Sequence, residues 1–476
     1  MRSVRIGGKL RRLRQDRRLT QIQMAETLEI SPSYLNLLES NQRPVTVRVL
    51  LKLAEKFQID LNTLAGDDDE RLTSALMEAF SDPMFDAADV KASDIKDVAA
   101  TLPAFGRAVL DLYNAYKRSP GGSGAVNVGE DTSDSPSLAI PSEEVTEFLQ
   151  KRLNHFPDLE EAAEQLWVEN GLAIHTLQRD LIQLLATRYA VDVDIAPSEG
   201  MNGALRHYNP LTRRLQLSEM LPIASRTFQL GVQIAYLGFR KEIDALIGGG
   251  KFSTPEADAL ARSALASYFA SAVMTPYPRF LEAARSTRYD INVLQHRFGI
   301  SFEQVCHRLT TLRRKGQEGV PFHLIRVDIA GNISKRFSAS GIHMARFGAA
   351  CPRWNVYDAF ATPGILRVQV SEMPDGQRFF CLASTIRPSG RGVARNGLMQ
   401  SGGQLALGLG TNLQYAREMI YADGLNLDDS QIVTPIGVSC RTCPRNDCAD
   451  RSVPSLHQRL ELDENRRGLS TYARVG

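Results

Sequence analysis

Three of the six cysteines of this 476-residue chain lie close together in the sequence, as Cys440, Cys443 and Cys448. Two thiolates that are two residues apart can bind one metal from a single turn, and the third can close a loop over it. Sulfur ligands beside arginines favour an iron–sulfur cluster, because the arginines offset its negative charge. We therefore expect an iron–sulfur cluster of the 4Fe–4S type. A structural zinc ion and free or redox-sensing thiols are the alternatives.

The fourth ligand must come from elsewhere, because no cysteine follows Cys448 and His457 is the only nearby histidine. Two candidates remain. Cys351 precedes a proline, an arginine and a tryptophan, and Cys381 lies in a strand-like run. We expect Cys351 to complete the ligand set and leave Cys381 open as the other possibility.

A stretch rich in glycine and arginine, residues 387–403, could bind phosphate groups. Glycines leave backbone N–H groups free, and guanidinium groups can form paired hydrogen bonds with a phosphate. A flexible basic loop without a ligand is the alternative interpretation. The expected ligand-binding residues are Arg353, Arg387, Arg391 and Arg395.

The N-terminal segment differs in charge from the rest of the chain. Residues 1–60 carry twelve Lys and Arg against six Asp and Glu, whereas the whole chain has 56 against 54. A local positive charge attracts a polyanion, and phosphate contacts make the largest general contribution to DNA affinity. Charge alone would equally suit a solvated helix face, so the apolar pattern must decide.

Apolar spacing and capping residues in the same segment predict a bundle of short helices. Thr20 is a good N-cap, and Ser31 followed by Pro32 is a typical helix start. Two short helices joined by a tight turn inside such a bundle form a helix-turn-helix. A bundle that binds protein instead of DNA is the alternative. The expected helices cover residues 6–13, 21–28, 32–40 and 46–57.

Residues 5–62 resemble the XRE (lambda-repressor-like) helix-turn-helix family, chiefly in the segments 19–21, 31–39 and 41–44. The resemblance implies that the helix after Ser31 enters the major groove, where short polar side chains can read base edges. It also implies phosphate contacts from Gln21 and Arg43 and a structural pair between Arg14 and Glu39. The expected DNA-binding residues are Gln21, Ser31, Pro32, Ser33, Tyr34, Asn36, Leu37 and Arg43.

Residues 226–237 resemble the central helix of ImmA/IrrE-type zinc peptidases, which carries an H-E-x-x-H motif. Two histidines at i and i+4 share a helix face and bind zinc, and the glutamate is the base. Here the matching positions hold Val232, Gln233 and Tyr236, and Leu265 replaces the carboxylate ligand of a later helix. We therefore expect the scaffold without the catalysis, and a chain that is not an enzyme. We expect the isolated histidines to be ordinary core or surface residues: His175, His207, His296 and His307.

The fold class we expect is mainly α with an α+β C-terminal part. Strand-like runs separated by turn signals predict an antiparallel sheet in the last third of the chain. The expected strands cover residues 323–329, 365–370, 378–383 and 405–409, and a helix covers 412–421. The expected domains are a DNA-binding domain (1–66), a helical connector (67–118), a flexible linker (119–140), a degenerate ImmA/IrrE-like domain (141–320), a sensor domain (321–460) and a tail (461–476).

Together these parts resemble the short-chain fatty acyl-CoA-responsive regulators of bacterial propionate and acetate assimilation. The resemblance rests on the segments 42–48, 228–230, 351–354 and 440–448. It implies a homodimer that binds promoter DNA and senses an acyl-CoA such as propionyl-CoA. The alternatives are an iron–sulfur redox sensor without an acyl-CoA ligand, an ImmA-type metallopeptidase and a phage-type repressor.

The sequence also predicts where the protein acts. It has no run of about eighteen apolar residues, and its basic N-terminus lacks the apolar core of a secretory signal. We expect a cytoplasmic protein without a membrane span.

Overall fold

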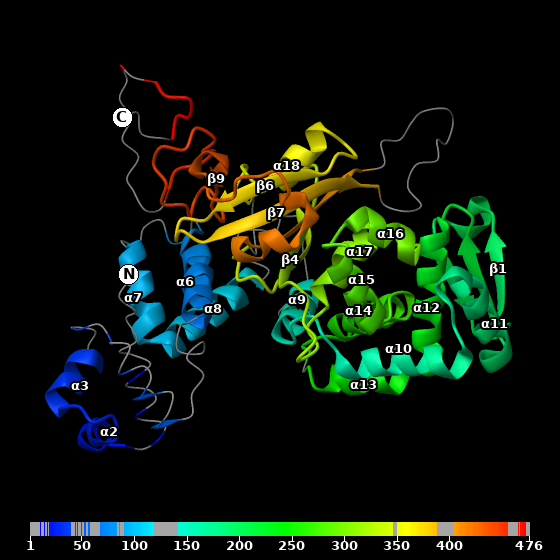
Figure 1. The fold of residues 1–476 in the computed structure, drawn as a ribbon, viewed down its shortest axis with the longest axis horizontal. Coiled ribbons are helices and arrows are strands. Elements are labelled where there is room, and N and C mark those ends of the chain that lie inside the picture. The colour runs from blue at the N-terminus through cyan, green and yellow to red at the C-terminus, as the bar shows by residue number, and fades with distance from the viewer. Residues whose placement is uncertain are drawn as a thin grey trace, which may run out of the picture. The chain divides into compact units, whose positions relative to one another are not determined.

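The computed structural model describes residues 10, 14, 17, 19–39, 43, 45, 49, 52–53, 56–57, 67–82, 85, 90–118, 141–250, 252–345, 350–387, 403–455, 465 and 467–472. The chain forms two compact units (Figure 1). The first comprises Met1–Asn127 with Leu456–Arg459, and the second comprises Val128–Ser455 with Leu460–Gly476. Among the described helices, none is long and apolar enough to cross a membrane.

Two helices of the first unit begin where the capping residues predict them. α2 (Gln21–Thr27) follows Thr20, whose hydroxyl and backbone N–H form a capping box with the third residue of the helix. α3 (Pro32–Glu39) follows Ser31, whose hydroxyl accepts a hydrogen bond from a backbone N–H of the first turn at 3.1 Å. The two predicted helices of the helix-turn-helix are therefore confirmed.

A small apolar core supports these helices. It also contains residues from before α2 and after α3, as the predicted bundle requires, although most of residues 6–13 and 46–57 lie outside the described part of the chain. Its members are Leu10, Met24, Ala25, Leu28, Leu35, Leu38, Val45, Val49, Leu53 and Phe57. A separate apolar cluster joins α6 (Asp67–Phe80), α7 (Ala92–Thr101) and α8 (Pro103–Arg118).

The second unit begins with helices and a three-stranded sheet. The sheet has the order β1-β3-β2, with β1 parallel and β2 antiparallel to the central strand. Its strands are β1 (Asp192–Ala196), β2 (Arg206–Asn209) and β3 (Arg214–Ser218). The helices are α9 (Pro141–Lys151), α10 (Pro157–Asn170), α11 (Leu177–Tyr189), α12 (Ile223–Gly238), α13 (Arg240–Gly248), α14 (Pro255–Met274), α15 (Tyr277–Ser286), α16 (Ile291–Phe298) and α17 (Phe302–Thr310).

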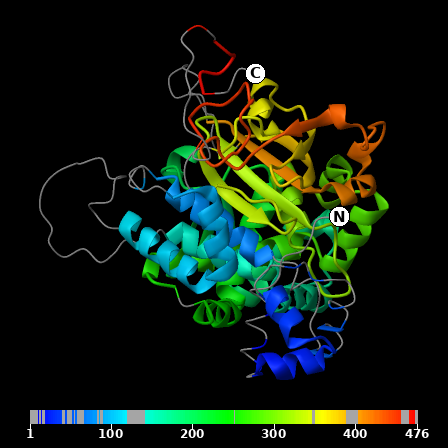
Figure 2. The same cartoon turned by 90° about the vertical axis from the view of Figure 1, so that its left-hand side faces the viewer.

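A six-stranded sheet follows, with the order β5-β4-β8-β7-β6-β9 (Figures 1 and 2). All its pairs are antiparallel except β6–β9, which is parallel. The segment 412–421, predicted as one helix, is helical but forms two short 3-10 helices, η5 (Leu413–Glu418) and η6 (Ile420–Ala422). The strands are β4 (Phe322–Asp328), β5 (Ile333–Ser338), β6 (Arg367–Glu372), β7 (Arg378–Ile386), β8 (Leu405–Asn412) and β9 (Val433–Pro435). The short helix α18 (Asn355–Asp358) precedes β6.

One apolar core continues across residue 320, where the sequence analysis divides two domains. It includes side chains of α10, α12, α14 and α17 together with side chains of β4, β7 and β8. Such continuity means that the helices and the larger sheet of the second unit stabilise one another.

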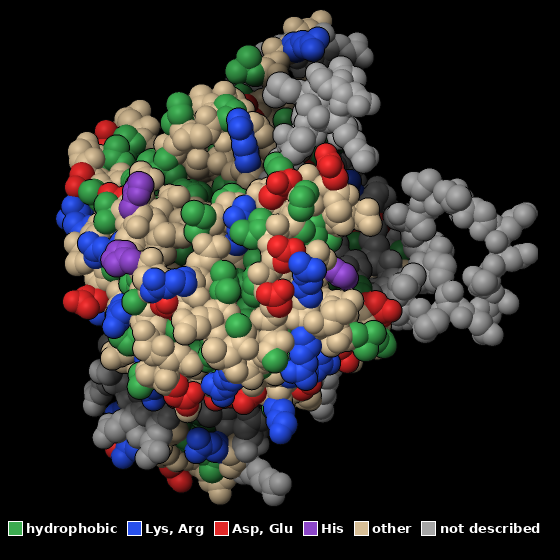
Figure 3. Space-filling model, turned by 90° about the vertical axis from the view of Figure 1, so that its right-hand side faces the viewer, with side chains coloured by type: hydrophobic (Ala, Val, Ile, Leu, Met, Phe, Trp, Pro, Cys, Tyr) green, Lys and Arg blue, Asp and Glu red, His purple; other side chains and the backbone are tan. Residues whose placement is uncertain are grey.

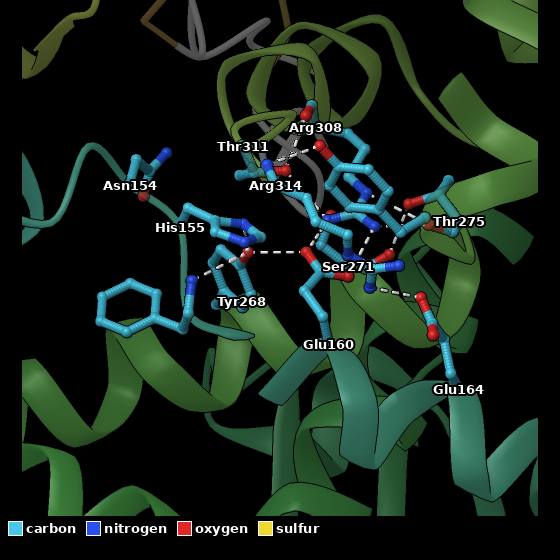
Figure 4. A network of polar contacts seen from close by, with 12 residues as sticks. Asn154, His155, Glu160, Glu164, Tyr268, Ser271, Thr275, Arg308, Thr311 and Arg314 are labelled. Carbon is cyan, nitrogen blue, oxygen red and sulfur yellow. Dashed lines mark hydrogen bonds and ion pairs between the residues drawn. The ribbon is translucent and has the colours of Figure 1, made fainter. Parts of the chain in front are cut away.

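A buried ion pair lies within this unit (Figure 4). Arg308 of α17 is fully buried and donates to both carboxylate oxygens of Glu160 of α10, at 2.5 and 2.9 Å. The guanidinium also donates to the carbonyl of Thr275 at the end of α14, and the hydroxyl of Tyr268 donates to Glu160 at 2.6 Å. Every charged atom of the pair therefore has a partner, which is the condition for burying charges at tolerable cost.

Candidate DNA-binding helix, degenerate metal centre and cysteine turn

α3 buries one face and exposes the face predicted to meet DNA. Leu35 and Leu38 are fully buried in the small apolar core of the DNA-binding head, the helix-turn-helix part of the first unit. The polar side chains on the other face are solvent-exposed, and Tyr34 and Leu37 are half-buried between the two faces. The exposed predicted residues are Ser31, Pro32, Ser33 and Asn36.

The orientation of α3 is fixed by a buried carboxylate. Arg14 donates from Nε and Nη2 to the two carboxylate oxygens of Glu39, at 2.7 and 3.1 Å, which confirms the predicted pair. The hydrogen bond to Glu39 raises the pKa of Arg14. Gln21 donates from Nε2 to the same carboxylate at 2.8 Å and to the side-chain oxygen of Asn36 at 3.4 Å. The side chain of Gln21 thus positions α3, and its contact with a phosphate stays a prediction.

Arg43 follows α3 and is solvent-exposed. Its backbone N–H donates to the carbonyl of Leu37 at 3.1 Å, so the chain after α3 folds back onto the helix. This connection keeps the backbone of Arg43 near the C-terminal end of α3, and its side chain is accessible to water.

The residues that match the peptidase H-E-x-x-H motif lie beside Arg206. Val232 and Gln233 of α12 are buried, and Leu265 of α14 is fully buried. Arg206 of β2 donates from Nη1 to the side-chain oxygen of Gln233 at 3.1 Å, and its Cζ lies 5.2 Å from the ring centre of Tyr236. Two of the three H-E-x-x-H positions therefore contact one guanidinium.

Burial lowers the pKa of Arg206, and no carboxylate among the described residues counteracts this effect. The sequence analysis did not single out Arg206, because an arginine is not a metal ligand and the resemblance directed attention to α12 and to Leu265 of α14. Its position at the start of a strand beside the degenerate motif was the only available signal.

The cysteine turn, residues 440–448, is held by the buried guanidinium of Arg451. Nη1 donates to the carbonyl of Cys440 at 2.5 Å, and Nη2 donates to that of Cys443 at 2.9 Å. The guanidinium also donates to the carbonyl of Arg445. One donor group thus satisfies three carbonyls of the turn and fixes the backbone that carries the thiols.

The four predicted ligand cysteines are neighbours. The backbone N–H of Cys351 donates to a carbonyl just before the cysteine turn at 3.0 Å. Burial raises the pKa of its thiol, and nearby Cys440 and Cys443 add to that effect. Burial raises the pKa of Cys443 too, and Cys448 adds to it. These donors suit an iron–sulfur cluster chemically, but no three Cys, His, Asp or Glu side chains of the described chain are arranged to hold a metal ion.

Cys381 lies at a different place, beside a small cavity in the six-stranded sheet. Its Sγ is 3.7 Å from Nε2 of His323, and Asn355 and Ser371 line the same cavity. Burial raises the pKa of Cys381 to about 12 and lowers that of His323 to about 3, so both groups are neutral near pH 7. No other thiol of the described residues influences the pKa of Cys381, which favours Cys351 as the fourth member of the set.

Two of the four arginines predicted to bind a ligand, Arg353 and Arg387, lie among the residues that the structure describes. Arg353 forms an ion pair with Asp450, with 3.3 Å between Nε and Oδ2, and so belongs to the surroundings of the cysteine turn. Arg387 is exposed at the end of β7, and Arg391 and Arg395 lie outside the described residues. On the face of the second unit drawn in Figure 3, basic and acidic side chains are interspersed, without a large area of one sign.

Three family models match successive parts of the chain. Residues 10–64 match "Helix-turn-helix", residues 186–310 match "IrrE N-terminal-like domain", and residues 311–472 match "Short-chain fatty acyl coenzyme A regulator, C-terminal". The order of the three matches is the order that the sequence analysis expected.

Whole-length relatives have the same character. The chain is 38% identical over 471 residues to the HTH-type transcriptional regulator RamB of Mycobacterium tuberculosis, covering 98% of both chains. It is 38% identical to the HTH-type transcriptional regulator PrpR of the same organism (96% and 93% covered). It is 40% identical to the propionyl-CoA carboxylase regulator of Cereibacter sphaeroides (98% and 98% covered).

A solved structure titled "Mycobacterium tuberculosis transcriptional regulator" has a TM-score of 0.66 and 39% identity, covering 71% of this chain and 100% of that chain. The relatives that match nearly the whole chain are thus named as regulators. The chain belongs to the family of helix-turn-helix transcriptional regulators that respond to short-chain fatty acyl-CoA.

Proposed function

We propose that this protein regulates genes of propionate metabolism by binding their promoter DNA in a manner that depends on a short-chain acyl-CoA such as propionyl-CoA. The observation that carries the proposal is the match to a propionyl-CoA carboxylase regulator over 98% of both chains. The exposed polar face of α3 supports DNA recognition, because Ser33 and Asn36 can reach base edges. The absence of both ligand histidines and of the catalytic glutamate of the H-E-x-x-H motif supports a protein without peptidase activity.

For the effector, we propose a binding site around Arg206. The guanidinium of Arg206 is half-buried, and among the described residues its partners are Gln233 and Tyr236, with no carboxylate. A ligand that carries negative charge would complete the site. A phosphate of coenzyme A would do so, and the amide of Gln233 and the ring of Tyr236 already orient the guanidinium. The exposed Arg387, with Arg391 and Arg395, remains the other candidate for phosphate contacts.

For the cofactor, we propose a 4Fe–4S cluster bound by Cys351, Cys440, Cys443 and Cys448, with a structural zinc ion as the alternative. The hydrogen bond that joins the backbone of Cys351 to the chain just before the cysteine turn, and the arginine-held backbone of the turn, support this proposal. When bound, the cluster would supply a redox-sensitive centre. The chain itself supplies Arg451, whose positive charge offsets the negative charge of the thiolates.

We further propose that the protein acts as a homodimer. A helix-turn-helix head contacts only one half-site, and two heads about one DNA turn apart read two half-sites. An effector then acts through its different affinity for two arrangements of the paired heads.

Fluorescence anisotropy with labelled DNA from the gene's own upstream region tests the proposal. Titrations at fixed salt, with and without propionyl-CoA, should give different dissociation constants. Asn36→Ala should weaken this site by roughly tenfold, in line with about 1–3 kcal/mol for a base contact, and weaken unrelated DNA far less. Ile22→Ala is the matched control, because Ile22 is 59% exposed on the neighbouring helix. An affinity that no acyl-CoA changes at any salt concentration would overturn the effector part of the proposal.

A redox sensor without an acyl-CoA ligand is the second candidate, and the clustered thiols favour it. Cys443→Ala separates the two functions. It should abolish the anaerobic absorption spectrum and iron content of the purified protein. If propionyl-CoA still changes DNA affinity in this variant, the cluster is not the only sensor.

A further inference from the structure

Lys335 lies in a compact cluster of charged side chains at the surface of the second unit. It belongs to β5, an edge strand of the six-stranded sheet, and its side chain is 45% exposed. Its Nζ is 3.2 Å from Nε2 of His307 of α17 and 3.5 Å from Oε1 of Glu303, one helical turn earlier. Arg326 is its direct cross-strand partner on β4.

The carboxylate of this cluster is engaged mainly by the arginine. Arg326 donates from Nη1 to Oε1 of Glu303 at 2.7 Å, a shorter contact than that of Lys335 to the same oxygen. One carboxylate thus faces both the guanidinium of Arg326 and the amine of Lys335. Like charges directly opposite each other on neighbouring strands repel. The arrangement therefore favours a neutral Lys335 more than an ordinary surface position does.

The electrostatics agree with the geometry. Crowding by protein atoms lowers the pKa of Lys335; Glu303 opposes this and Arg326 reinforces it. Burial and the charge of Lys335 lower the pKa of His307 to about 4, although Glu303 opposes them. His307 is therefore a neutral imidazole near pH 7, and with its proton on Nδ1 it can accept a proton at Nε2. An amine next to a base within hydrogen-bond reach is the usual arrangement of an activated nucleophile.

We propose that Lys335 is an acylation site, at which an acyl thioester transfers its acyl group to Nζ with His307 as the proton acceptor. The neutral amine attacks the thioester carbonyl carbon, the C–N bond forms and the C–S bond breaks. The proton of Nζ passes through Nε2 of His307 to the departing thiolate, which leaves as a free thiol. The step needs no oxidant or reductant.

The identity of the thioester as an acyl-CoA rests on the proposed function. Lys335 lies within the part of the chain, residues 311–472, that matches the acyl coenzyme A regulator family. Acylation removes the charge that opposes Arg326 and leaves the Arg326–Glu303 pair intact. The modification would thus record past exposure to the effector in a covalent form, at contacts between α17, β4 and β5.

Mass spectrometry of the full-length protein tests the proposal. The protein is incubated with propionyl-CoA, or with a small propionyl thioester that lacks the nucleotide, and propionylation of each lysine is followed with time. We expect Lys335 to react faster than the exposed Lys241 and Lys315 with both reagents. We expect His307→Gln to slow Lys335 by roughly tenfold or more without affecting the other two lysines. Circular dichroism of the variant checks that it is folded.

The two reagents separate the acylation site from the identity of its acyl donor. If the small thioester modifies Lys335 preferentially but propionyl-CoA does not, the acylation site stands and an acyl-CoA is excluded as its donor. The effector part of the proposed function is decided separately, by the DNA-affinity titrations with propionyl-CoA. Equal rates at Lys335 and Lys315 with the small thioester would overturn the acylation site. An unchanged rate of Lys335 acylation in His307→Gln would also overturn it. If that variant is unfolded, the comparison of Lys335 with Lys315 in the unaltered protein decides the question by itself.

Discussion

The ion pair of Arg308 and Glu160 provides the sharpest test of the second unit. Arg308→Met keeps most of the side-chain volume and removes the charge. The carboxylate of Glu160 would then stay buried, and among the described residues it would keep the hydroxyl of Tyr268 and the half-buried His155 as neighbours. The carbonyl of Thr275 would lose both of its hydrogen bonds from the guanidinium.

The expected loss of unfolding free energy is large. Removing one partner of a fully buried pair leaves an uncompensated charge and typically costs about 3–5 kcal/mol. Replacing both residues with apolar ones, as in Arg308→Met with Glu160→Leu, should recover much of this loss, because no buried charge remains. Arg417→Met is the matched control. Its partner is Asp428, the two side chains are 75% and 83% exposed, and the expected cost is below about 1 kcal/mol.

Tryptophan fluorescence during urea denaturation is the suitable assay. Both tryptophans, Trp167 and Trp354, lie in the second unit, so the signal does not include unfolding of the head. A loss of less than about 1 kcal/mol for Arg308→Met would refute the reasoning, since it would mean that Glu160 finds water or another cation in the folded protein.

Three further predictions follow from the same structure. In Gly410→Ala the new Cβ would lie 2.5 Å from the ring of His323, so we expect a loss of about 1–3 kcal/mol in denaturation experiments, and a smaller loss in a His323→Ala background. Arg206→Ala should weaken propionyl-CoA binding by roughly tenfold or more in calorimetry and leave the unliganded protein no less stable; undiminished affinity would exclude this site. Burial opposes ionisation of Glu160 and Glu303, but neighbouring cations hold the pKa of each below 4.5. The contribution of the two ionised carboxylates to stability is therefore complete above about pH 4.5 and is lost as the pH falls below this value. The urea midpoint should accordingly decrease between pH 6 and pH 3. A midpoint that stays constant over this range would contradict the prediction.

The sequence predicted the elements whose signals are local. Ser31 followed by Pro32 gave the start of the recognition helix, and the spacing of its leucines gave the buried face. Capping and apolar periodicity act within a few residues, so they can be recognised without the fold. The pair of Arg14 and Glu39 was predicted only because a resemblance supplied the tertiary arrangement.

The elements that were missed depend on distant parts of the chain. β5 carries charged residues at Lys335 and Arg336, which weakens the apolar alternation of an edge strand. β9 has three residues and exists only because β6 pairs with it. Arg206 and Arg451 could not be recognised as site residues from the sequence. Their roles depend on the side-chain amide and the backbone carbonyl groups that the fold brings within hydrogen-bond distance of them.

The position of β9 has a consequence for the lifetime of the protein. This strand ends at Pro435, just before the cysteine turn, and it covers the outer edge of β6. Arg445 of the turn donates to the carbonyl of Glu372 at the end of β6, so the turn and the sheet edge are fastened together. Chemical damage to the thiols that loosens the turn would uncover the unpaired N–H and C=O groups of β6. An uncovered edge can pair with a strand of another molecule, so oxidation should lead to aggregation of the regulator.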